Sequence, residues 1–179
     1  MIKNLLIVLA SVFAIASCGT SKTGANKKAI AYAELNSTAD PNQKIGDVSF
    51  YTQPDGRIKM VMTINMKEKA NRSVAVHFHE HGDCGNKGDN THGHWNPTKE
   101  NHGQWGVPPF HSGDIGNINL NSAGKGTVTL VSDRWSVDAQ SPNNIVGRGI
   151  IVHSGIDDYK TQPTGNSGPR AGCGVIVKP

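Results

Sequence analysis

The residues of this chain best suited to chemistry are its eight histidines, none of which precedes residue 77. The stretch VAVHFHEHGDC, residues 74–84, places His77 and His79 two positions apart after an apolar run. On an extended strand, side chains two positions apart project from the same face. Two imidazoles on one face suit a single metal ion, although a pair of incidental surface histidines would explain them if nothing else followed.

A second group of candidate ligands follows within one polar segment. His94 lies in GHWNP, His102 in ENHGQ, and His111 lies with Asp114 in FHSGD. Three imidazoles and one carboxylate form a four-ligand set that suits tetrahedral zinc. Taken singly, each of these residues is more simply interpreted as a solvent-exposed loop residue, but the four together favour a metal site. His153 ends the apolar segment RGIIVHS, and imidazole-rich sets with few carboxylates favour copper as well as zinc.

The elements that must position these residues are predicted to be short strands separated by turns. The chain holds 21 glycines and 9 prolines with 36% hydrophobic residues, which suits a turn-rich β protein. Outside the N-terminal leader, no segment sustains the 3.6-residue apolar period of a helix. The expected strands are 29–35, 45–52, 58–66, 73–79, 115–121, 126–132, 148–154 and 174–179. The pattern predicts one all-β domain.

Two long polar segments, 82–114 and 155–172, interrupt the strands. Loops of that length without regular structure are uncommon in compact domains unless they are functional or held by another group. A metal ion bound within the first segment would order it. The candidate ligands and the loop lengths therefore lead to the same prediction.

The charge balance bears on the class of partner. The formal net charge is +4, and no dense block of lysine and arginine occurs, so nucleic acid is not an expected partner. A mild positive balance still favours a small anion.

The first 17 residues are predicted to be a signal peptide. Lys3 precedes an apolar run that is too short to span a membrane comfortably. Ile15-Ala16-Ser17-Cys18 resembles the bacterial lipobox, which implies a lipid anchor on Cys18, a membrane-attached location in the cell envelope or periplasm, and a polar tether over 18–28. The alternative is an ordinary signal peptide cleaved near Ala16 or Cys18. Either reading predicts export.

The chain has three cysteines. With Cys18 assigned to lipid, Cys84 and Cys173 remain as a candidate disulfide in an oxidising compartment. That bond would close a loop of about 90 residues and contribute ~4 kcal/mol in the chain-entropy model. Two free thiols are the alternative.

Taken together, the motifs over about residues 29–179 resemble the copper-zinc superoxide dismutase family. The resemblance rests on HFHE with GDC (77–84), GHWNP (93–97), His102, HSGDIGN (111–117), the GR…H pattern (147–153) and GNSGPRAGCGV (165–175). It implies an eight-stranded antiparallel Greek-key sandwich or barrel of immunoglobulin-like type with two long functional loops. It also implies one copper and one zinc per chain. The implied reaction converts superoxide to dioxygen and hydrogen peroxide by alternate reduction and reoxidation of copper.

The resemblance also implies a role for each matched residue. Copper would be held by His77, His79, His94 and His153, and zinc by His94, His102, His111 and Asp114, so that His94 is shared and takes up a proton during turnover. Arg170 would draw the anion towards copper. Asp157 would link a copper-ligand imidazole to a zinc-ligand imidazole, with an exposed acid beside Asp158 as the alternative. Cys84 would pair with Cys173.

Some features depart from the family pattern or match nothing in it. The last loop carries Lys160-Thr161-Gln162-Pro163, whereas many eukaryotic members carry acidic residues there. Interface residues vary within the family, so a homodimer is one option among others. His81 and His92 match no family ligand; solvated loop histidines are the favoured interpretation, and an auxiliary metal-capturing site is the sharper one.

Two other functions compete with an enzyme. One is a dismutase-like module that stores or delivers copper or zinc, although a carrier would need neither the shared His94 nor Arg170. The other is a zinc-stabilised adhesion sandwich, which leaves His77, His79 and His153 without a purpose.

Overall fold

The computed structural model describes residues 28–179. The predicted signal peptide 1–17, the predicted lipidation site at Cys18 and the predicted tether as far as residue 27 lie outside the described residues. Within the described part of the chain, no helix is both long and apolar enough to cross a membrane.

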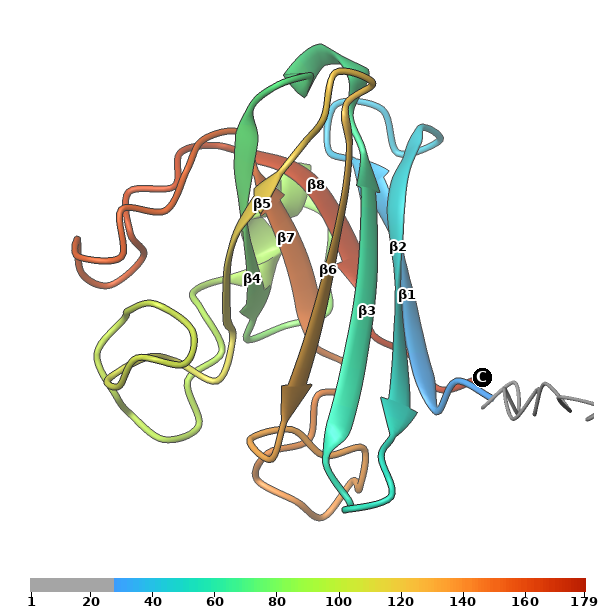
Figure 1. The fold of residues 1–179 in the computed structure, drawn as a ribbon, viewed down its shortest axis with the longest axis vertical. Helices are drawn as coiled ribbons and strands as arrows, with labels where there is room; N and C mark the ends of the chain where they lie inside the picture. Colours follow the sequence, from blue (N-terminus) through green and yellow to red (C-terminus); the bar gives the residue numbers. More distant parts are fainter. Residues whose placement is uncertain (1–27) are drawn as a thin grey trace, which may run out of the picture.

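Eight antiparallel strands form a nearly closed barrel, as predicted (Figure 1). Their order in the sheet is β5-β4-β7-β8-β1-β2-β3-β6. Several consecutive strands pair with each other, while the pairs β4/β7, β8/β1 and β3/β6 join strands that are not consecutive in sequence, as in a Greek key. The strands are β1 (Ala31–Ser37), β2 (Lys44–Thr52), β3 (Ile58–Asn65), β4 (Ser73–His79), β5 (Asp114–Asn119), β6 (Lys125–Ser132), β7 (Gly149–His153) and β8 (Arg170–Val175). Two short 3-10 helices, η1 (Lys67–Lys69) and η2 (Asn86–Thr91), lie in the connections.

Successive side chains of a strand point to opposite faces, so that one face can pack in the hydrophobic core while the other carries the histidines. In β3 every second residue from Ile58 to Ile64 is buried in the barrel. In β4 and β7 both faces are buried. One face, with Val76, Phe78 and Val152, joins the hydrophobic core. His77, His79 and His153 occupy the opposite face.

The two long loops cover that opposite face. Figure 1 shows the loop between β4 and β5 and the loop between β7 and β8 projecting on the same side of the barrel, next to β4, β5 and β7. The predicted long segments are therefore present, and they lie over the strands that carry the histidines.

Seven of the eight predicted strands match observed ones to within two residues at each end, and the last was misplaced. A strand was expected over 174–179, but β8 spans Arg170–Val175 and pairs with β7 and β1. The error arose because Gly172 and Gly174 have no apolar side chain to reveal the pattern. Both are needed for packing: a Cβ at Gly174 would overlap the carbonyl oxygen of Glu34, and one at Gly172 would overlap the side chain of Ile45.

Candidate metal centre

Irregularities in strand pairing lie next to two of the histidines, His77 and His153. The pairing of β4 with β5 shifts between Val76 and His77, and that of β7 with β8 shifts between Val152 and His153. Such bulges re-aim a side chain without ending the strand. His79 follows two residues after His77, so both rings emerge on the same face of β4.

Four imidazoles meet over that face, namely His77, His79, His94 and His153. One ring nitrogen from each lies within 4.8 Å of the others. The His77 and His94 rings are stacked, with their centroids 3.9 Å apart, and His94 reaches this position because it forms an isolated bridge with His79. All four residues are buried.

In each ring of this set, one nitrogen is hydrogen-bonded to a protein group and the other has no hydrogen-bond partner. His77 Nε2 donates to Asp157 at 2.9 Å, His79 Nδ1 donates to the carbonyl oxygen of His92 at 2.8 Å, and His153 Nδ1 donates to the Gly168 carbonyl oxygen at 3.0 Å. The buried nitrogens without a hydrogen-bond partner are Nδ1 of His77 and Nε2 of His79, His94 and His153. Buried polar atoms are rarely left unpaired, so convergent bare nitrogens fit a metal ion that favours imidazole.

A second set consists of His94, His102, His111 and Asp114, whose ligand atoms also lie within 4.8 Å of one another. The three rings present Nδ1 to the Asp114 carboxylate at 3.0, 3.0 and 3.2 Å. Asp114 is further fixed by the backbone N–H groups of Gly103 and His111, at 3.1 and 2.8 Å. Three imidazoles and one carboxylate, all buried, fit tetrahedral zinc.

His94 belongs to both sets. Its Nδ1 lies 3.0 Å from Asp114 in the second set, and its Nε2 is the bare atom directed to the first set. The structure thus brings together the seven residues predicted to bind metal and places one ring between the two groups.

Asp157 connects the two sets on their far side. Its two carboxylate oxygens accept hydrogen bonds from His77 Nε2 and His102 Nε2, both at 2.9 Å. The carboxylate is buried, so the alternative of an exposed acid is wrong. Hydrogen bonds of this kind fix which nitrogen of each ring stays free for a metal.

The electrostatics prepare the first set for a cation. Burial lowers the pKa of His77 to about 3, of His79 to about 2 and of His153 to about 4. Burial lowers the pKa of His94 as well. All four rings are therefore neutral at pH 7, which is the form that binds metal.

Two buried carboxylates, Asp114 in the second set and Asp157 beside it, bring negative charge to this part of the site. Burial alone would raise the pKa of Asp114, but hydrogen bonds from His102, His111 and His94 hold it well below its usual range. Burial would also favour a neutral His102, yet its hydrogen bonds to Asp114 and Asp157 raise its pKa to about 9. Two buried carboxylates thus require a positive charge between them, and a divalent cation supplies it.

Arg170 stands beside the first set. It begins β8 and is the cross-strand partner of His153. Its Nη1 donates to the Gly88 carbonyl oxygen and to the hydroxyl of Thr91, and its Nη2 donates to the His92 carbonyl oxygen at 2.7 Å. The guanidinium is held by this loop while about a fifth of its side chain stays exposed.

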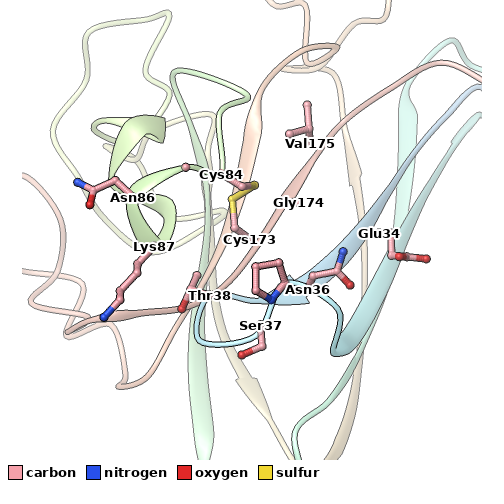
Figure 2. Close-up of a pocket in the computed structure, with 12 residues that line it drawn as sticks. Glu34, Asn36, Ser37, Thr38, Cys84, Asn86, Lys87, Cys173, Gly174 and Val175 are labelled. Carbon is pink, nitrogen blue, oxygen red and sulfur yellow. A yellow bond between two sulfur atoms is a disulfide. The ribbon is translucent and has the colours of Figure 1, made fainter.

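The Cys84–Cys173 disulfide fixes that loop to the barrel, and the pairing predicted from the cysteines is present (Figure 2). It joins residues 89 apart, with Cα atoms 5.8 Å from each other. Cys173 lies in β8, and Cys84 precedes η2, whose residues Gly88 and Thr91 hold Arg170. The disulfide therefore stabilises the position of the arginine.

Several supporting residues were missed from the sequence. Asn117 and Asp157 exchange two hydrogen bonds, of 2.8 and 2.9 Å. The Gln162 side chain makes two hydrogen bonds of 2.9 Å with the backbone of His102. Gly165 has φ +66°, and a Cβ there would overlap Asp157 and His102. Asn117 could have been suspected of a supporting role from its place in the HSGDIGN motif. The other residues gave no such signal, because their contacts join segments far apart in sequence.

Comparison with known proteins agrees with this geometry. The family model described as copper/zinc superoxide dismutase matches residues 44–176. Superoxide dismutase [Cu-Zn] 1 of Aquifex aeolicus is 30% identical over 80% of this chain and 88% of its own. Extracellular superoxide dismutase [Cu-Zn] of Drosophila melanogaster is 32% identical over 92% of this chain and 96% of its own.

A solved structure is also similar to this chain in fold. A SOD-like protein from Bacillus subtilis superposes with a TM-score of 0.70 at 28% identity, over 80% of this chain and 96% of that one. On the family match and on the relatives, the chain belongs to the copper/zinc superoxide dismutase family.

Proposed function

We propose that this protein converts two superoxide anions and two protons to dioxygen and hydrogen peroxide. The proposal assigns copper to His77, His79, His94 and His153, and zinc to His94, His102, His111 and Asp114, one ion of each per chain. The observation that carries it is the His94 ring, which directs a bare Nε2 to one set and its Nδ1 to the other. Copper, when bound, supplies reversible one-electron chemistry, and zinc, which has no redox chemistry, supplies charge and order.

His94 is the proposed proton carrier. Its Nε2 is buried in the first set and makes no hydrogen bond to protein, so a proton can be held there and passed to the reduced substrate. Its Nδ1 is fixed towards Asp114, so the ring keeps its orientation when Nε2 changes partner.

Arg170 is the proposed anion-binding residue. Its positive charge is fixed next to His153 by hydrogen bonds to the η2 loop. A pre-positioned guanidinium attracts a small anion and orients it without the cost of ordering a mobile side chain. Lys160 in the last loop is exposed and adds positive charge.

The test is metal analysis combined with a dismutation assay on the purified protein. We expect near-stoichiometric copper and zinc together with activity. His153→Ala should abolish activity while largely sparing zinc, because His153 belongs to the first set alone. Glu68→Gln, a change at an exposed residue of η1 outside the metal-binding groups, is the control and should retain activity. Full occupancy of both metals without turnover would favour the carrier function instead.

We also propose that the chain is exported and anchored by lipid on Cys18 after removal of residues 1–17, with 18–28 as tether and 29–179 as the enzyme domain. The lipobox-like sequence supports this, as does the disulfide, since such bonds persist in oxidising compartments. The Drosophila relative is named extracellular. Mass spectrometry should find a lipid-modified Cys18 at the new N-terminus, and an unmodified terminus elsewhere would replace the anchor with a soluble form. A homodimer is one possible assembly, and sedimentation equilibrium would distinguish it from a monomer.

A further inference from the structure

Three exposed residues outside both buried sets form another group with metal-ligand chemistry. A ligand atom from each of Glu80, His81 and His92 lies within 4.8 Å of the other two. The rings of His81 and His92 are in edge contact, with their centroids 4.6 Å apart. Neither the family resemblance nor the proposed reaction gives these side chains a role.

The backbone holds the three residues together. The N–H of Glu80 donates to the Gly93 carbonyl oxygen at 3.0 Å, and the N–H of His81 donates to the Thr91 carbonyl oxygen at 3.2 Å. His92 has φ +61° and ψ −139°, a backbone conformation that residues other than glycine seldom adopt. The segment around residue 80 therefore lies against the segment around residue 92, and the two imidazoles meet at its surface.

The ligand atoms are free to bind. Within residues 28–179, the side chains of Glu80, His81 and His92 make no hydrogen bond or ion pair to protein. The nearby cation Arg148 donates to the Glu80 carbonyl oxygen at 2.7 Å and to the Asn144 carbonyl oxygen, and forms no ion pair with the Glu80 carboxylate. Arg170 donates a hydrogen bond to the backbone carbonyl oxygen of His92 and none to its ring.

We propose that Glu80, His81 and His92 form a third metal site, exposed to solvent, that binds Cu(II). Two imidazoles and a carboxylate provide nitrogen and oxygen ligands that suit a divalent transition ion, and Cu(II) is bound most strongly by such sets among the first-row divalent ions. Metal–nitrogen bonds of about 2 Å require the three atoms to close from their present separation. Exposed side chains do so by rotation, at a cost in conformational entropy that makes this site weaker than the buried ones.

The site lies at the edge of the first buried set. The carbonyl oxygen of His92 accepts the hydrogen bond from His79 Nδ1, so one residue contributes its ring to the surface group and its backbone to a proposed copper ligand. The third site itself does not depend on the proposed reaction.

The experiment uses the full protein already loaded with one copper and one zinc. Cu(II) is added, and binding is followed by equilibrium dialysis and by electron paramagnetic resonance, with zinc release measured to detect displacement from the second set. We expect the wild type to take up one further Cu(II) with a spectrum of its own, without release of zinc. Side-chain NMR resonances of His81 and His92 should broaden as it binds.

The variants are chosen to keep the fold. H81N/H92N replaces both imidazoles with amides, and asparagine, like histidine, occurs at positive φ more often than most residues. The double variant should weaken binding of the additional Cu(II) at least tenfold. E80Q should weaken it by a smaller factor, whereas E68Q, the same change at an exposed acid on η1, should leave it unchanged. Equal affinity in wild type and H81N/H92N, or no additional Cu(II) in the wild type, overturns the proposal. Dismutation is assayed before the titration, so inactivity of the loaded protein would refute the proposed function alone.

Discussion

At the scale of single residues, each buried ring owes its direction to the partner of its other nitrogen. Asp157 shows this most clearly, because its two oxygens orient one ring from each set, His77 and His102, at 2.9 Å. The sequence placed Asp157 beside Asp158 and could not distinguish a buried carboxylate from an exposed one. Contacts across 80 and 55 residues are invisible to local pattern.

Replacing Asp157 with asparagine should therefore loosen both rings. An amide accepts a hydrogen bond through only one of its atoms, so one imidazole loses its partner. We expect zinc affinity to fall about 10–100-fold, the usual effect of removing such an orienting group. Competition with a chromogenic chelator measures it, with Asp47→Asn on the exposed face of β2 as the control. Unchanged zinc affinity would contradict an orienting role.

The pH dependence of the metal-free protein follows from the same residues. His77, His79 and His153 have folded-state pKa values of about 3, 2 and 4 against 6.5 when unfolded. The unfolded chain binds more protons in this range, so stability should fall as pH drops below about 6.5. Each histidine contributes a slope of about 1.4 kcal/mol per pH unit until its folded-state pKa is approached.

His102 makes the opposite contribution to the pH dependence of stability. Its pKa is raised to about 9, so its contribution is complete below pH 6.5 and is lost as pH rises towards 9. With respect to these groups, the metal-free protein should be most stable near pH 6.5. Urea unfolding at pH 5, 6.5 and 8.5 measures this, and a stability that rises steadily on acidification from pH 6.5 would refute it.

At the scale of elements, strands with alternating or continuous apolar residues were located from sequence, and those built around glycine were not. β4 was predicted without error because SVAVHFH combines β-branched residues with period-two histidines. β8 was misplaced because its sequence RAGCGV offers little apolar pattern. Its packing against β1 nevertheless requires glycine at position 174, where a side chain would overlap the carbonyl oxygen of Glu34. Neither 3-10 helix was expected, since such short turns carry little periodicity.

The disulfide links two of these elements, β8 and the η2 loop. The double variant C84S/C173S should lose about 4 kcal/mol of unfolding free energy in the chain-entropy model for a loop of this length. The η2 loop should also loosen around Arg170, lowering activity even where the barrel is folded. Denaturant titration and hydrogen exchange of residues 85–92 measure the two effects. Unchanged exchange in this loop would show that the disulfide does not position Arg170.

At the scale of the whole molecule, the barrel supplies a rigid face and the two loops complete the site over it (Figure 1). The loops contain few apolar residues, so their order depends on the polar groups that they bury. The fold class and the residues of the two sets could be predicted because they come from strands and from short, dense motifs. The residues that hold the loops, such as Gln162 and Gly165, could not, because they act only across the folded structure.

Removal of metal should consequently destabilise the molecule and leave the loops first to open. Binding to the folded state alone stabilises a protein in proportion to the logarithm of ligand concentration over Kd, so a tightly bound ion contributes several kcal/mol. We expect chelation to lower the Tm markedly and to increase hydrogen exchange at residues 93–113 before that of β3. Equal Tm values with and without metal would show that the loops are ordered without a cation.

The central claim is that the His94 ring lies between two different metal ions. Anomalous diffraction from crystals of the metal-loaded protein, recorded at the copper and zinc absorption edges, tests it most directly. The account predicts one copper peak next to His94 Nε2, shared with His77, His79 and His153, and one zinc peak next to His94 Nδ1, shared with His102, His111 and Asp114. A ring that contacts one ion only, or both peaks of the same element in the fully loaded protein, would contradict it.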